Sequence, residues 1–409
     1  MSPFLVYDLR ANNDTGVSRY GLSLLAPCAR ALTEAGWRLS VVARPQQKRR
    51  AEEAVTGLDI PVTCAPVEEG FVRRSPWLRQ MLVTEGADLY FTSHYTVDRD
   101  CPVPFVFTIH DLIRLRLPEF SYTDATFAAR FGAEELDLIG RELEALAAFD
   151  ESKEGEELFT RYFRAINRYL AEQAAGIVTV SRSSAYDIES MLGAAPERLA
   201  IVLGGVDRPT FKPHDQARQQ LVLATYSIAR PYLAFVGLTH PHKRFLWLLE
   251  QLIERRDEFP PEAQLVAVGG YAENTPGVAE LLTRNQAEDF VKFTGHISDP
   301  DLAALYSGAS ALVIASLSEG GNLPALEALA CGCPVIATDI PPLREVLGAA
   351  ASYYNPFSGT EMTQLATAAL TGHLRTGADA FSPPSWAEAG TRLARVLSAA
   401  AGRPATTGS

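Results

Sequence analysis

Short apolar segments alternate with longer amphipathic segments along most of this chain. Each short segment is mostly apolar instead of alternating with polar residues, which is typical of parallel strands covered by helices on both faces. The regular succession of the two kinds of segment predicts an α/β fold with doubly wound parallel sheets. The strand-like segments are residues 3–8, 38–43, 88–93, 104–109, 176–180 and 199–203, followed by 232–237, 263–270, 290–295, 311–316 and 334–339.

The strand–helix pattern occurs twice, which predicts two similar domains. A chain of 409 residues is also longer than one hydrophobic core usually accommodates. A polar, proline-containing stretch near 205–225 separates the halves, so we place an N-terminal domain at 1–213 and a C-terminal domain at 214–380. A helix at 381–400 and a disordered tail at 401–409 complete the prediction.

One segment interrupts this rhythm. Residues 121–175 contain no strand-like run, and the acidic stretch 133–159 within them favours helix. We interpret 121–175 as a helical insertion in the N-terminal domain. It is either a solvated lid over the sheet of that domain or an element that contacts a partner or shapes the acceptor site.

Composition and charge narrow the class of protein. The formal net charge is −12, and an acidic chain is poorly suited to nucleic acid, which needs clustered lysine and arginine. The five cysteines form neither an even disulfide set nor a zinc pattern, which favours reduced thiols in the cytoplasm. No apolar run approaches the roughly 20 residues that span a bilayer, and the N-terminus does not resemble a signal peptide. We therefore expect a cytoplasmic protein.

The densest candidate site lies in residues 311–339, which predict a strand, a glycine-containing loop, a helix and a second strand. Ligands of open α/β sheets bind beyond the carboxyl ends of the strands. Gly320 and Gly321 allow the backbone to approach a ligand there, and a helix that begins near Leu323 directs its positive end to the same place. The loop through Asn322 is therefore predicted to be an anion site suited to a diphosphate.

Two carboxylates flank this loop. Glu319 lies within it, and Glu327 lies about one turn into the helix. Carboxylates accept hydrogen bonds in pairs, which suits the hydroxyl groups of a sugar or a ribose. At this spacing the two carboxylates can reach opposite ends of a nucleotide sugar.

The same stretch resembles a known family. Glu319 and Glu327, within EGGNLPALEALACGCPVIATD, resemble the E-x7-E motif of the retaining GT-B glycosyltransferases of family 4. The resemblance implies two Rossmann-like domains that face an interdomain cleft, with the donor nucleotide on the C-terminal domain and the acceptor on the N-terminal domain. It also implies that the C-terminal helix packs back on the N-terminal domain. Further segments similar to this family are 15–25, 107–112, 177–193, 204–213, 236–244 and 293–309.

On the donor side, the resemblance implies that Glu327 holds the ribose and that Glu319 contacts hydroxyls of the transferred sugar. Lys243 matches the cation that pairs with the diphosphate. Many members carry an arginine where this chain has Leu238, and Arg244 is the candidate replacement. The backbone of the loop would surround the sugar and the diphosphate. Its residues are Gly320, Gly321, Asn322 and Leu323. The polar Asn322 departs from the usual family loop and bears on which sugar is accepted.

Other residues acquire roles in the same way. His110 matches the active-site histidine near the exocyclic carbon of the sugar, with Asp111 as its structural companion. Gly16 would let the first loop approach the diphosphate or the acceptor. His296 falls in the donor-binding segment 293–309.

The implied reaction is transfer of a glycosyl group with retention of anomeric configuration, with His110, Glu319 and Lys243 as the catalytic residues and without a metal or other cofactor. GDP-mannose is the first candidate donor, and UDP- and dTDP-sugars come next. The acceptor would be a hydroxyl group of a glycan, a glycolipid or a small molecule. The alternatives are a GT-B-fold epimerase or phosphorylase, and a non-catalytic carbohydrate-binding relative.

Two short patterns could indicate a metal. Asp98-Arg99-Asp100 and Asp299-Pro300-Asp301 both satisfy the D-x-D pattern that binds a divalent metal in another glycosyltransferase architecture. Such short patterns arise often by chance, and Asp299 followed by Pro300 is typical of a helix start with aspartate as N-cap. We therefore predict no metal site.

Basic residues gather in the N-terminal half despite the acidic total. Mixed with large apolar residues, they suit an anionic membrane surface or a phosphorylated acceptor. The protein would then be peripheral at the inner face of the membrane, with a lipid-linked acceptor; otherwise the patch is an ordinary solvated surface. The residues are Lys48, Arg49, Arg50, Arg73, Arg74, Arg79, Arg114 and Arg116, with Phe71, Trp77, Leu78 and Leu82.

Overall fold

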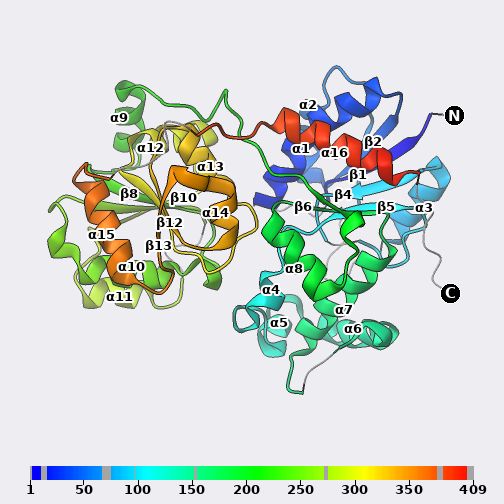
Figure 1. Cartoon of the computed structure of the whole chain (residues 1–409), viewed down its shortest axis with the longest axis horizontal. Helices are drawn as coiled ribbons and strands as arrows, with labels where there is room; N and C mark the ends of the chain where they lie inside the picture. The colour runs from blue at the N-terminus through cyan, green and yellow to red at the C-terminus, as the bar shows by residue number, and fades with distance from the viewer. Residues whose placement is uncertain are drawn as a thin grey trace. The chain divides into compact units, whose positions relative to one another are not determined.

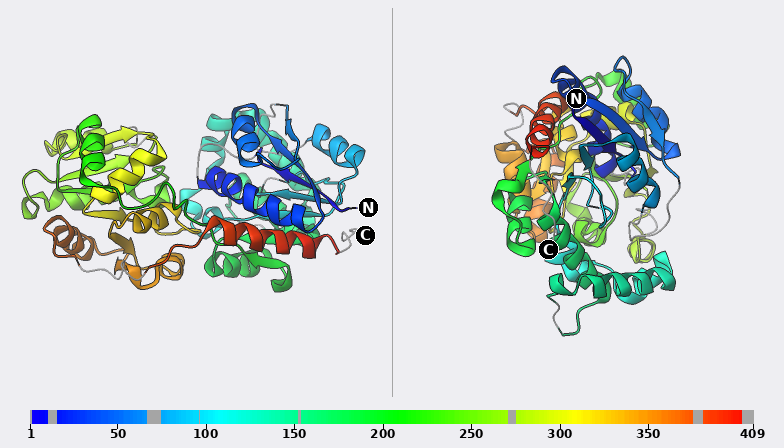
Figure 2. Two further views of the ribbon diagram at one scale, coloured as in Figure 1. Left: turned by 90° about the horizontal axis from the view of Figure 1, so that it is seen from above. Right: turned by 90° about the vertical axis from the view of Figure 1, so that its right-hand side faces the viewer.

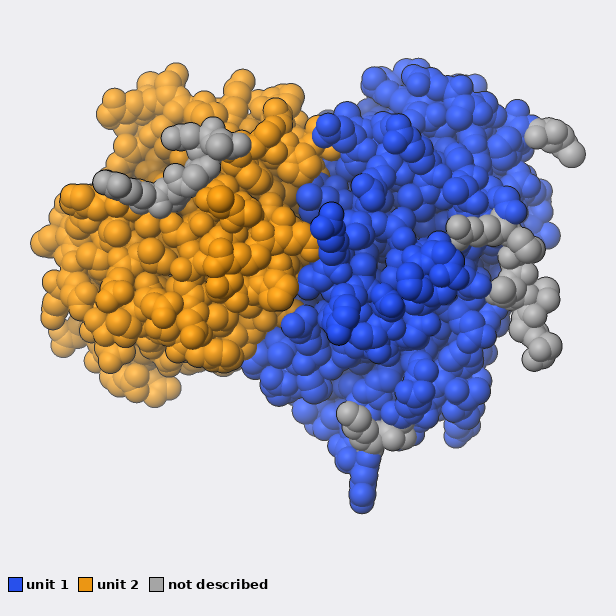
Figure 3. Space-filling model, in the orientation of Figure 1, with its two compact units in different colours: residues 1–204, 386–409 blue, residues 205–385 orange. Residues whose placement is uncertain are grey.

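The computed structural model describes residues 2–10, 16–66, 75–95, 97–151, 154–270, 275–374 and 381–402. Within these residues the chain forms two compact units, which divide at Gly204–Gly205 and again at Ser385–Trp386 (Figure 3). Unit 1 holds the N-terminal part of the chain and its last helix, and unit 2 holds the residues between. The boundary expected at 213–214 lies a short distance beyond the first division. Residues 403–409 of the expected tail lie outside the described residues.

Unit 1 is built on a seven-stranded sheet in which all neighbouring strands are parallel. The strands are β1 (Phe4–Asp8), β2 (Arg38–Ala43), β3 (Val62–Cys64), β4 (Leu89–Thr92), β5 (Phe105–Thr108), β6 (Gly176–Thr179) and β7 (Leu199–Ile201). Their order is β3-β2-β1-β4-β5-β6-β7, so the direction of winding reverses between β1 and β4 (Figure 1).

Helices cover both faces of this sheet. They are α1 (Gly16–Glu34), α2 (Pro45–Ala54), α3 (Pro76–Glu85), α4 (Ile113–Arg116), α5 (Asp124–Phe131), α6 (Ala133–Ala145), α7 (Leu158–Gln173), α8 (Arg182–Leu192) and α16 (Trp386–Ala400), with 3-10 turns η1 (Pro118–Phe120), η2 (Ala147–Phe149) and η3 (Pro196–Arg198). Leu5 and Tyr7 pack against the side of α1 and α16, which lie side by side in Figure 2. Phe4 and Val6 of the same strand pack into the core on the other side. Both sets are apolar because both faces are covered, which explains the continuous apolar segments.

The predicted insertion forms α5, α6, η2 and α7. Phe127, Ile139 and Phe159 are fully buried in the core that these helices share with the sheet. α7 is also the helix that connects to β6, as expected between two parallel strands. Of these elements, only α5, α6 and η2 are therefore extra in the alternation of strands and helices. The segment is therefore a packed layer of unit 1.

Unit 2 contains a six-stranded parallel sheet. The strands are β8 (Tyr232–Val236), β9 (Gln264–Val268), β10 (Val291–Gly295), β11 (Ala311–Ile314), β12 (Val335–Thr338) and β13 (Ala351–Tyr354). Their order is β10-β9-β8-β11-β12-β13, and the winding reverses between β8 and β11 (Figure 1). The helices are α9 (Gln216–Thr225), α10 (Phe245–Glu254), α11 (Val278–Arg284), α12 (Asp299–Gly308), α13 (Leu323–Ala330), α14 (Pro341–Leu347) and α15 (Gly359–Leu370), with 3-10 turns η4 (Pro241–Lys243), η5 (Arg256–Glu258) and η6 (Gly348–Ala350).

The two sheets confirm the predicted class of two doubly wound parallel α/β domains. The hydrophobic pattern found the central strands of both sheets and missed the edge strands β3 and β13. Among the described residues, no helix combines the length and the apolar character needed to cross a membrane.

Candidate functional site

The candidate site of unit 2 lies where the order of its strands reverses. β8 and β11 are neighbours, and the chain leaves them in opposite directions, toward β9 and toward β12. The segments that follow their carboxyl ends therefore diverge, which is where open α/β sheets bind ligands. Lys243 lies in η4 after β8, and Glu319 lies in the loop after β11. The fold thus brings together two predicted residues that are 76 positions apart.

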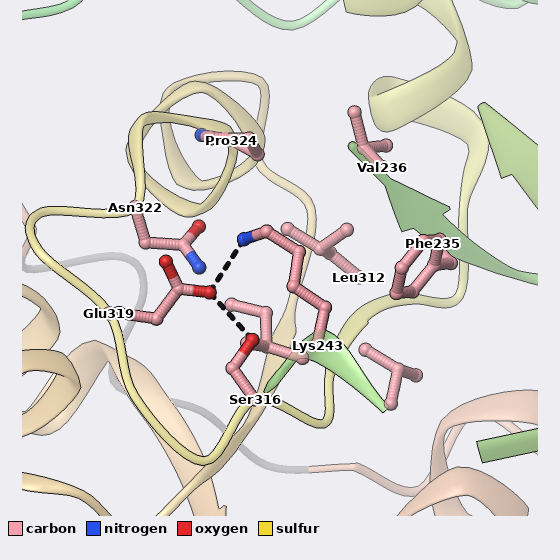
Figure 4. Close-up of a pocket in the computed structure, with 10 residues that line it drawn as sticks. Phe235, Val236, Lys243, Leu312, Ser316, Glu319, Asn322 and Pro324 are labelled. Atoms are coloured by element: carbon pink, nitrogen blue, oxygen red, sulfur yellow. Dashed lines mark hydrogen bonds and ion pairs between the residues drawn. The ribbon is translucent and has the colours of Figure 1, made fainter. Parts of the chain in front are cut away.

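Glu319 is the centre of a hydrogen-bonded group of side chains (Figure 4). Lys243 Nζ lies 2.7 Å from Glu319 Oε1, and Ser316 Oγ donates to the same oxygen at 2.6 Å. Thr338 Oγ1, at the end of β12, donates to the backbone carbonyl of Ser316 at 2.7 Å. The side chain of Glu319 is 7% exposed and that of Lys243 is 21% exposed, so the ion pair is partly shielded from water.

The charge state of Glu319 follows from these neighbours. Burial by itself raises the pKa of a carboxyl group, but the charges of Lys243 and His242, together with the hydrogen bonds from Lys243 and Ser316, outweigh it. They hold the pKa of Glu319 below its ordinary value. Glu319 is therefore an ionised hydrogen-bond acceptor at neutral pH.

The pocket around the ion pair combines polar groups with apolar walls. Figure 4 shows the Lys243 ammonium and the Glu319 carboxylate pointing toward each other, with Asn322 beside them. A few convergent polar groups within apolar walls are typical of sites that orient a polar ligand. The lining residues are Phe235, Val236, Lys243, Leu312, Val313, Ile314, Ser316, Glu319, Asn322 and Pro324.

Asn322 begins the helix that follows the loop. Its φ is 45°, and its Oδ1 accepts a hydrogen bond from Ala325 N at 3.1 Å, so it is the N-cap of α13. The predicted helix start at Leu323 agrees with this geometry. Because Asn322 and Pro324 both line the pocket, the positive end of α13 lies at the pocket.

The other predicted donor-side residues lie outside the pocket lining. Glu327 is buried within α13 with 5% exposure. Gly320 and Gly321 form the loop between Glu319 and the N-cap. His296 is exposed, directly after the edge strand β10. The roles assigned to these residues stay predictions.

Arg244 does not join Lys243 and Glu319. Its guanidinium carbon lies 3.7 Å from the centroid of the Trp247 ring, and its Nη1 donates to the carbonyl of Pro356. Burial lowers the pKa of Arg244, against an opposing effect of Tyr354. The role of Arg244 as the replacement for the family cation stays a prediction.

His110 lies in unit 1, two residues after β5. Its Nε2 lies 2.9 Å from the carbonyl oxygen of Ser93, and its ring packs edge-on against Tyr20 of α1 at a centroid distance of 4.9 Å. Because a carbonyl only accepts, Nε2 carries the proton, and Nδ1 is an acceptor in the neutral ring. Burial lowers the pKa of His110 to about 4, although the hydrogen bond to Ser93 opposes the shift.

Two further predicted residues, Asp111 and Gly16, lie near the carboxyl ends of the unit 1 strands. Asp111 Oδ1 accepts a hydrogen bond from Ile113 N at 3.1 Å and so supports the start of α4. Gly16 is the first residue of α1 and is exposed, and a Cβ there would meet no atom within 4 Å. The space around Gly16 would accommodate a ligand, and the role predicted for Gly16 stays a prediction.

The two D-x-D patterns have structural partners. Asp98 is buried and accepts from Ser75 N at 2.8 Å, and Asp100 pairs with Arg79 at 3.1 Å. Ser298, not Asp299, is the N-cap of α12, because its hydroxyl accepts from Asp301 N. The N-cap prediction was therefore wrong by one residue. In the part of the chain that the structure describes, no group of three or more His, Cys, Asp or Glu residues could hold a metal ion.

Several residues of the basic patch of the N-terminal half pair with acidic residues, whereas Arg114 forms no ion pair within the described residues. Lys48 pairs with Glu52 at 3.6 Å and Arg49 with Glu53 at 2.9 Å, both on α2. Arg79 pairs with Asp98 and Asp100. Arg73, Arg74 and Phe71 lie outside the described residues. Ion pairs of this kind are typical of an ordinary solvated surface.

Sequence reasoning missed the residues that position Glu319. Ser316 donates a hydrogen bond to Glu319, and His242 acts on Glu319 through its charge. Thr338 acts indirectly, because its hydroxyl donates to the backbone carbonyl of Ser316. Two of them could have been found in the sequence because Ser316 and Thr338 lie at the carboxyl ends of predicted strands. The signal for His242 is its place next to Lys243. Such positions identify a group of residues only after the strand order is known.

Two parts of the chain match family descriptions. Residues 24–208 match the family described as Glycosyltransferase Family 4, and residues 230–371 match the one described as Glycosyl transferases group 1. The first match lies in unit 1 except for its last residues, 205–208, and the second lies within unit 2.

Curated proteins with similar sequences include mannosyltransferases. The chain is 33% identical over 186 residues to the MMP alpha-(1->4)-mannosyltransferase of Mycolicibacterium hassiacum, over 46% of this chain and 42% of the relative. It is 27% identical over 195 residues to the O-antigen chain mannosyltransferase RfbU of Salmonella typhimurium, over 48% of this chain and 51% of the relative. The chain thus spans about half the length of the curated relatives it matches.

Solved structures resemble the whole chain in fold. Anabaena HepE in complex with UDP-glucose has a TM-score of 0.67 at 16% identity and covers 97% of this chain and 99% of its own. WaaG, a glycosyltransferase involved in lipopolysaccharide biosynthesis, has a TM-score of 0.60 at 16% identity and covers 98% of this chain and 97% of its own. At this level of identity the likeness shows a shared fold.

Proposed function

Because the chain belongs to glycosyltransferase family 4, we propose that it transfers a glycosyl group from a nucleotide-diphosphate sugar to a hydroxyl group of an acceptor. The observation that carries this proposal is the pocket in which Lys243, Glu319 and the start of α13 meet. A cation and a helix N-terminus suit a diphosphate, and a carboxylate beside them suits sugar hydroxyls.

Lys243 and the start of α13 would act on the leaving group. When the bond between the anomeric carbon and the donor oxygen breaks, negative charge grows on the leaving diphosphate. Positive groups fixed in place before the reaction stabilise such charge. Glu319 pairs with Lys243 in the pocket, and the donor diphosphate would replace that carboxylate as the partner of Lys243. Glu319 would then accept hydrogen bonds from the sugar.

Retention of anomeric configuration is part of the proposal. The new bond forms between the anomeric carbon and the acceptor oxygen, on the face from which the diphosphate leaves. The proton of the acceptor hydroxyl passes to the leaving phosphate, so no nucleophile or general base of the enzyme is required. Lys243 and the α13 N-terminus supply the positive charge, so we propose that no metal is required.

GDP-mannose is the first donor that we propose, with UDP- and dTDP-sugars next. Curated relatives named as mannosyltransferases support the first choice. Solved structures of similar fold in complex with UDP and with UDP-glucose support the second. The acceptor would be a hydroxyl group of a glycan, a glycolipid or a small molecule. The ion pairs of the basic patch favour a solvated surface over peripheral membrane contact.

A binding and turnover panel tests the proposal. GDP-, UDP-, dTDP- and ADP-sugars are added without metal to the wild type, to Glu327→Ala and to the control Glu280→Ala, and thermal shift and nucleotide release are measured. Glu280 is exposed on α11, in the same unit. We expect one nucleotide class to stabilise the wild type and the control, and Glu327→Ala to lose at least about tenfold in affinity.

The same panel separates the alternatives. Nucleotide release on addition of an acceptor, unchanged by EDTA, supports a metal-independent transferase. Conversion of the donor without any acceptor indicates an epimerase, and sugar phosphate formed from inorganic phosphate indicates a phosphorylase. A folded protein that responds to no sugar nucleotide contradicts the proposed function.

A further inference from the structure

Arg114 lies at the carboxyl end of the unit 1 sheet, in the short helix α4 that follows β5. Its guanidinium carbon lies 4.8 Å from the centroid of the Tyr122 ring and 5.5 Å from that of Phe159. Tyr122 lies between η1 and α5, and Phe159 lies in the first turn of α7, so side chains from three parts of unit 1 meet at Arg114. The two aromatic faces hold the guanidinium in place and leave it half-buried.

A second arginine contacts the same tyrosine. The guanidinium carbon of Arg130, an exposed residue of α5, lies 5.7 Å from the Tyr122 centroid and 5.5 Å from that of Phe131. Both guanidinium groups therefore lie near the same Tyr122 ring. Tyr122 has the positive charges of two arginines near its ring, and an anion that approached both would be attracted by both.

Neither of these two arginines lies within ion-pair distance of a carboxylate among the described residues. Neither Arg114 nor Arg130 forms an ion pair there, whereas Arg116, on the same helix as Arg114, pairs with Asp187 at 3.0 Å. Burial by itself lowers the pKa of Arg114, but the hydroxyl groups of Tyr95 and Tyr122 raise it above its ordinary value. Arg114 is thus a charged group whose described partners are tyrosine hydroxyls and aromatic faces.

The position of Arg114 indicates a ligand. His110 and Asp111 lie in the same connection between β5 and α4, and Tyr95 follows the carboxyl end of the neighbouring strand β4. The carboxyl ends of parallel strands are where α/β sheets bind ligands. A cation held there without a carboxylate partner is available to an anionic group that arrives with the ligand.

We propose that Arg114, with Arg130 beside it, binds a phosphate group carried by the acceptor. The inference rests on the proposed glycosyl transfer, which makes the ligand of unit 1 an acceptor. Phosphate fits better than a neutral sugar because the planar guanidinium donates two parallel hydrogen bonds to phosphate oxygens and the charges attract. The phosphate belongs either to a soluble molecule or to a lipid-linked one.

Calorimetric titration of the full-length chain with glycerol 3-phosphate tests this site, without nucleotide and at constant ionic strength. The variants are Arg114→Met and the matched control Arg116→Met. Methionine keeps an apolar chain against the Tyr122 and Phe159 rings and removes the charge. We expect Arg114→Met to weaken binding about tenfold or more, and Arg116→Met to change it by less than about twofold.

A second arm separates the two sources of phosphate. Phosphatidylcholine vesicles that contain phosphatidic acid are tested for co-sedimentation with the same variants. Arg114-dependent binding of glycerol 3-phosphate indicates a soluble acceptor, and Arg114-dependent binding to the vesicles alone indicates a lipid-linked acceptor. If neither binds through Arg114, or if Arg116→Met causes an equal loss, the proposal is wrong.

Two further measurements keep the result decisive. If circular dichroism shows that Arg114→Met is unfolded, Arg114→Lys is titrated instead, because lysine keeps the charge and loses the bidentate fork. Unchanged phosphate affinity in Arg114→Lys then contradicts the proposal.

Nucleotide-sugar binding to the wild type and to Arg114→Met is measured separately. If the wild type binds no nucleotide sugar, the proposed function fails, whereas normal nucleotide binding without Arg114-dependent phosphate binding rejects only this inference.

Discussion

Glu319 shows how single residues set the charge of the unit 2 pocket. Its carboxylate is nearly buried, and it stays ionised because Lys243 and Ser316 both reach Oε1. Removing the partner of a buried ion leaves that ion without compensation, which destabilises a protein more than the intact pair stabilises it. The pair is therefore sensitive to the loss of Lys243.

Lys243→Met is expected to destabilise unit 2 by about 1–3 kcal/mol at pH 7, a figure reduced for the partial exposure of Lys243. In the wild type the pKa of Glu319 lies below its ordinary value, so its stabilising effect is present above pH 4.5 and is lost as the pH falls through the lower, folded-state pKa. Without Lys243, burial raises the pKa of Glu319. Glu319 of the variant is therefore protonated as the pH falls, which removes the unfavourable buried charge. Urea unfolding between pH 7.5 and 4 should show the difference from wild type narrowing.

Lys292→Met is the control for this experiment, because Lys292 is a half-buried lysine of β10 outside the pocket lining. It should show no comparable dependence on pH. A difference between wild type and Lys243→Met that stays constant down to pH 4 would rule out the ion pair with Glu319 as its origin.

His110 illustrates the opposite case, a residue kept neutral by its surroundings. Its pKa of about 4 lies below the ordinary value of 6.5 because burial disfavours the imidazolium form. Above pH 6.5 neither folded nor unfolded His110 binds a proton, and between pH 6.5 and about 4 only the unfolded form does. Acidification across this range therefore favours unfolding.

His110→Gln is expected to remove that pH dependence. The shift corresponds to roughly 3 kcal/mol of stability lost by the wild type between pH 6.5 and 4. Glutamine cannot be protonated, and its Nε2 can still donate to the Ser93 carbonyl. Urea unfolding of both proteins at several pH values should show a smaller loss for the variant. Equal losses would show that His110 is already protonated in the folded protein or is not buried.

At the scale of elements, glycines allow the strand ends of the unit 2 sheet to approach closely. Gly237, Gly269 and Gly295 follow or end β8, β9 and β10, and each has a positive φ. At Gly269 the φ is 131°, and a Cβ would lie 2.4 Å from the carbonyl oxygen of Gly237. At Gly295 the φ is 65°, and a Cβ would meet no atom within 4 Å. The two positions differ in the space available for a side chain.

Gly269→Ala is expected to destabilise unit 2 by about 3 kcal/mol or more, because both the backbone conformation and the contact with Gly237 oppose a side chain. Gly295→Ala, the matched control, should cost about 1 kcal/mol, since only its left-handed backbone opposes alanine. Chemical denaturation gives both values. Similar losses in the two variants would contradict the close approach of β8 and β9.

At the scale of the whole molecule, the last helix returns to the first unit. α16 packs along α1, and Leu393 and Leu397 enter the same core as Tyr7 and Leu24. Gly390 allows the two helices to meet closely, because a Cβ there would lie 2.5 Å from Cγ of Pro27 and 2.8 Å from Cys28 N. Unit 1 therefore depends on residues from both ends of the chain.

Gly390→Ala is expected to destabilise unit 1 by about 1–3 kcal/mol, because overpacking against Pro27 outweighs the better helix propensity of alanine. Gly140→Ala on α6 is the control, since the nearest atom to its Cβ would lie at 3.8 Å. That variant should gain up to about 1 kcal/mol from helix propensity alone. Urea unfolding followed by circular dichroism measures both, and stabilisation by Gly390→Ala would contradict the close packing of α1 and α16.

Much of this fold was predictable because burial on both faces leaves a mark in the sequence. Central strands such as β8 and β11 are apolar throughout, since helices cover both sides of each sheet. The edge strands β3 and β13 were missed because they are short and partly exposed and contain polar residues, so no continuous apolar run marks them. The helix after the Glu319 loop was predictable from its own proline and N-cap.

The sequence by itself determined the two α/β halves, the glycine-containing loop that holds Glu319 and the resemblance to the family, because each depends on residues that are close together along the chain. The tertiary structure decided which distant residues meet. Lys243 pairs with Glu319, and Arg244 stacks on Trp247. His110 is buried against Tyr20 and stays neutral, and Arg114 forms no ion pair among the described residues. Burial, charge pairing and close packing depend on distance in space, and strand order sets that distance only after the chain has folded.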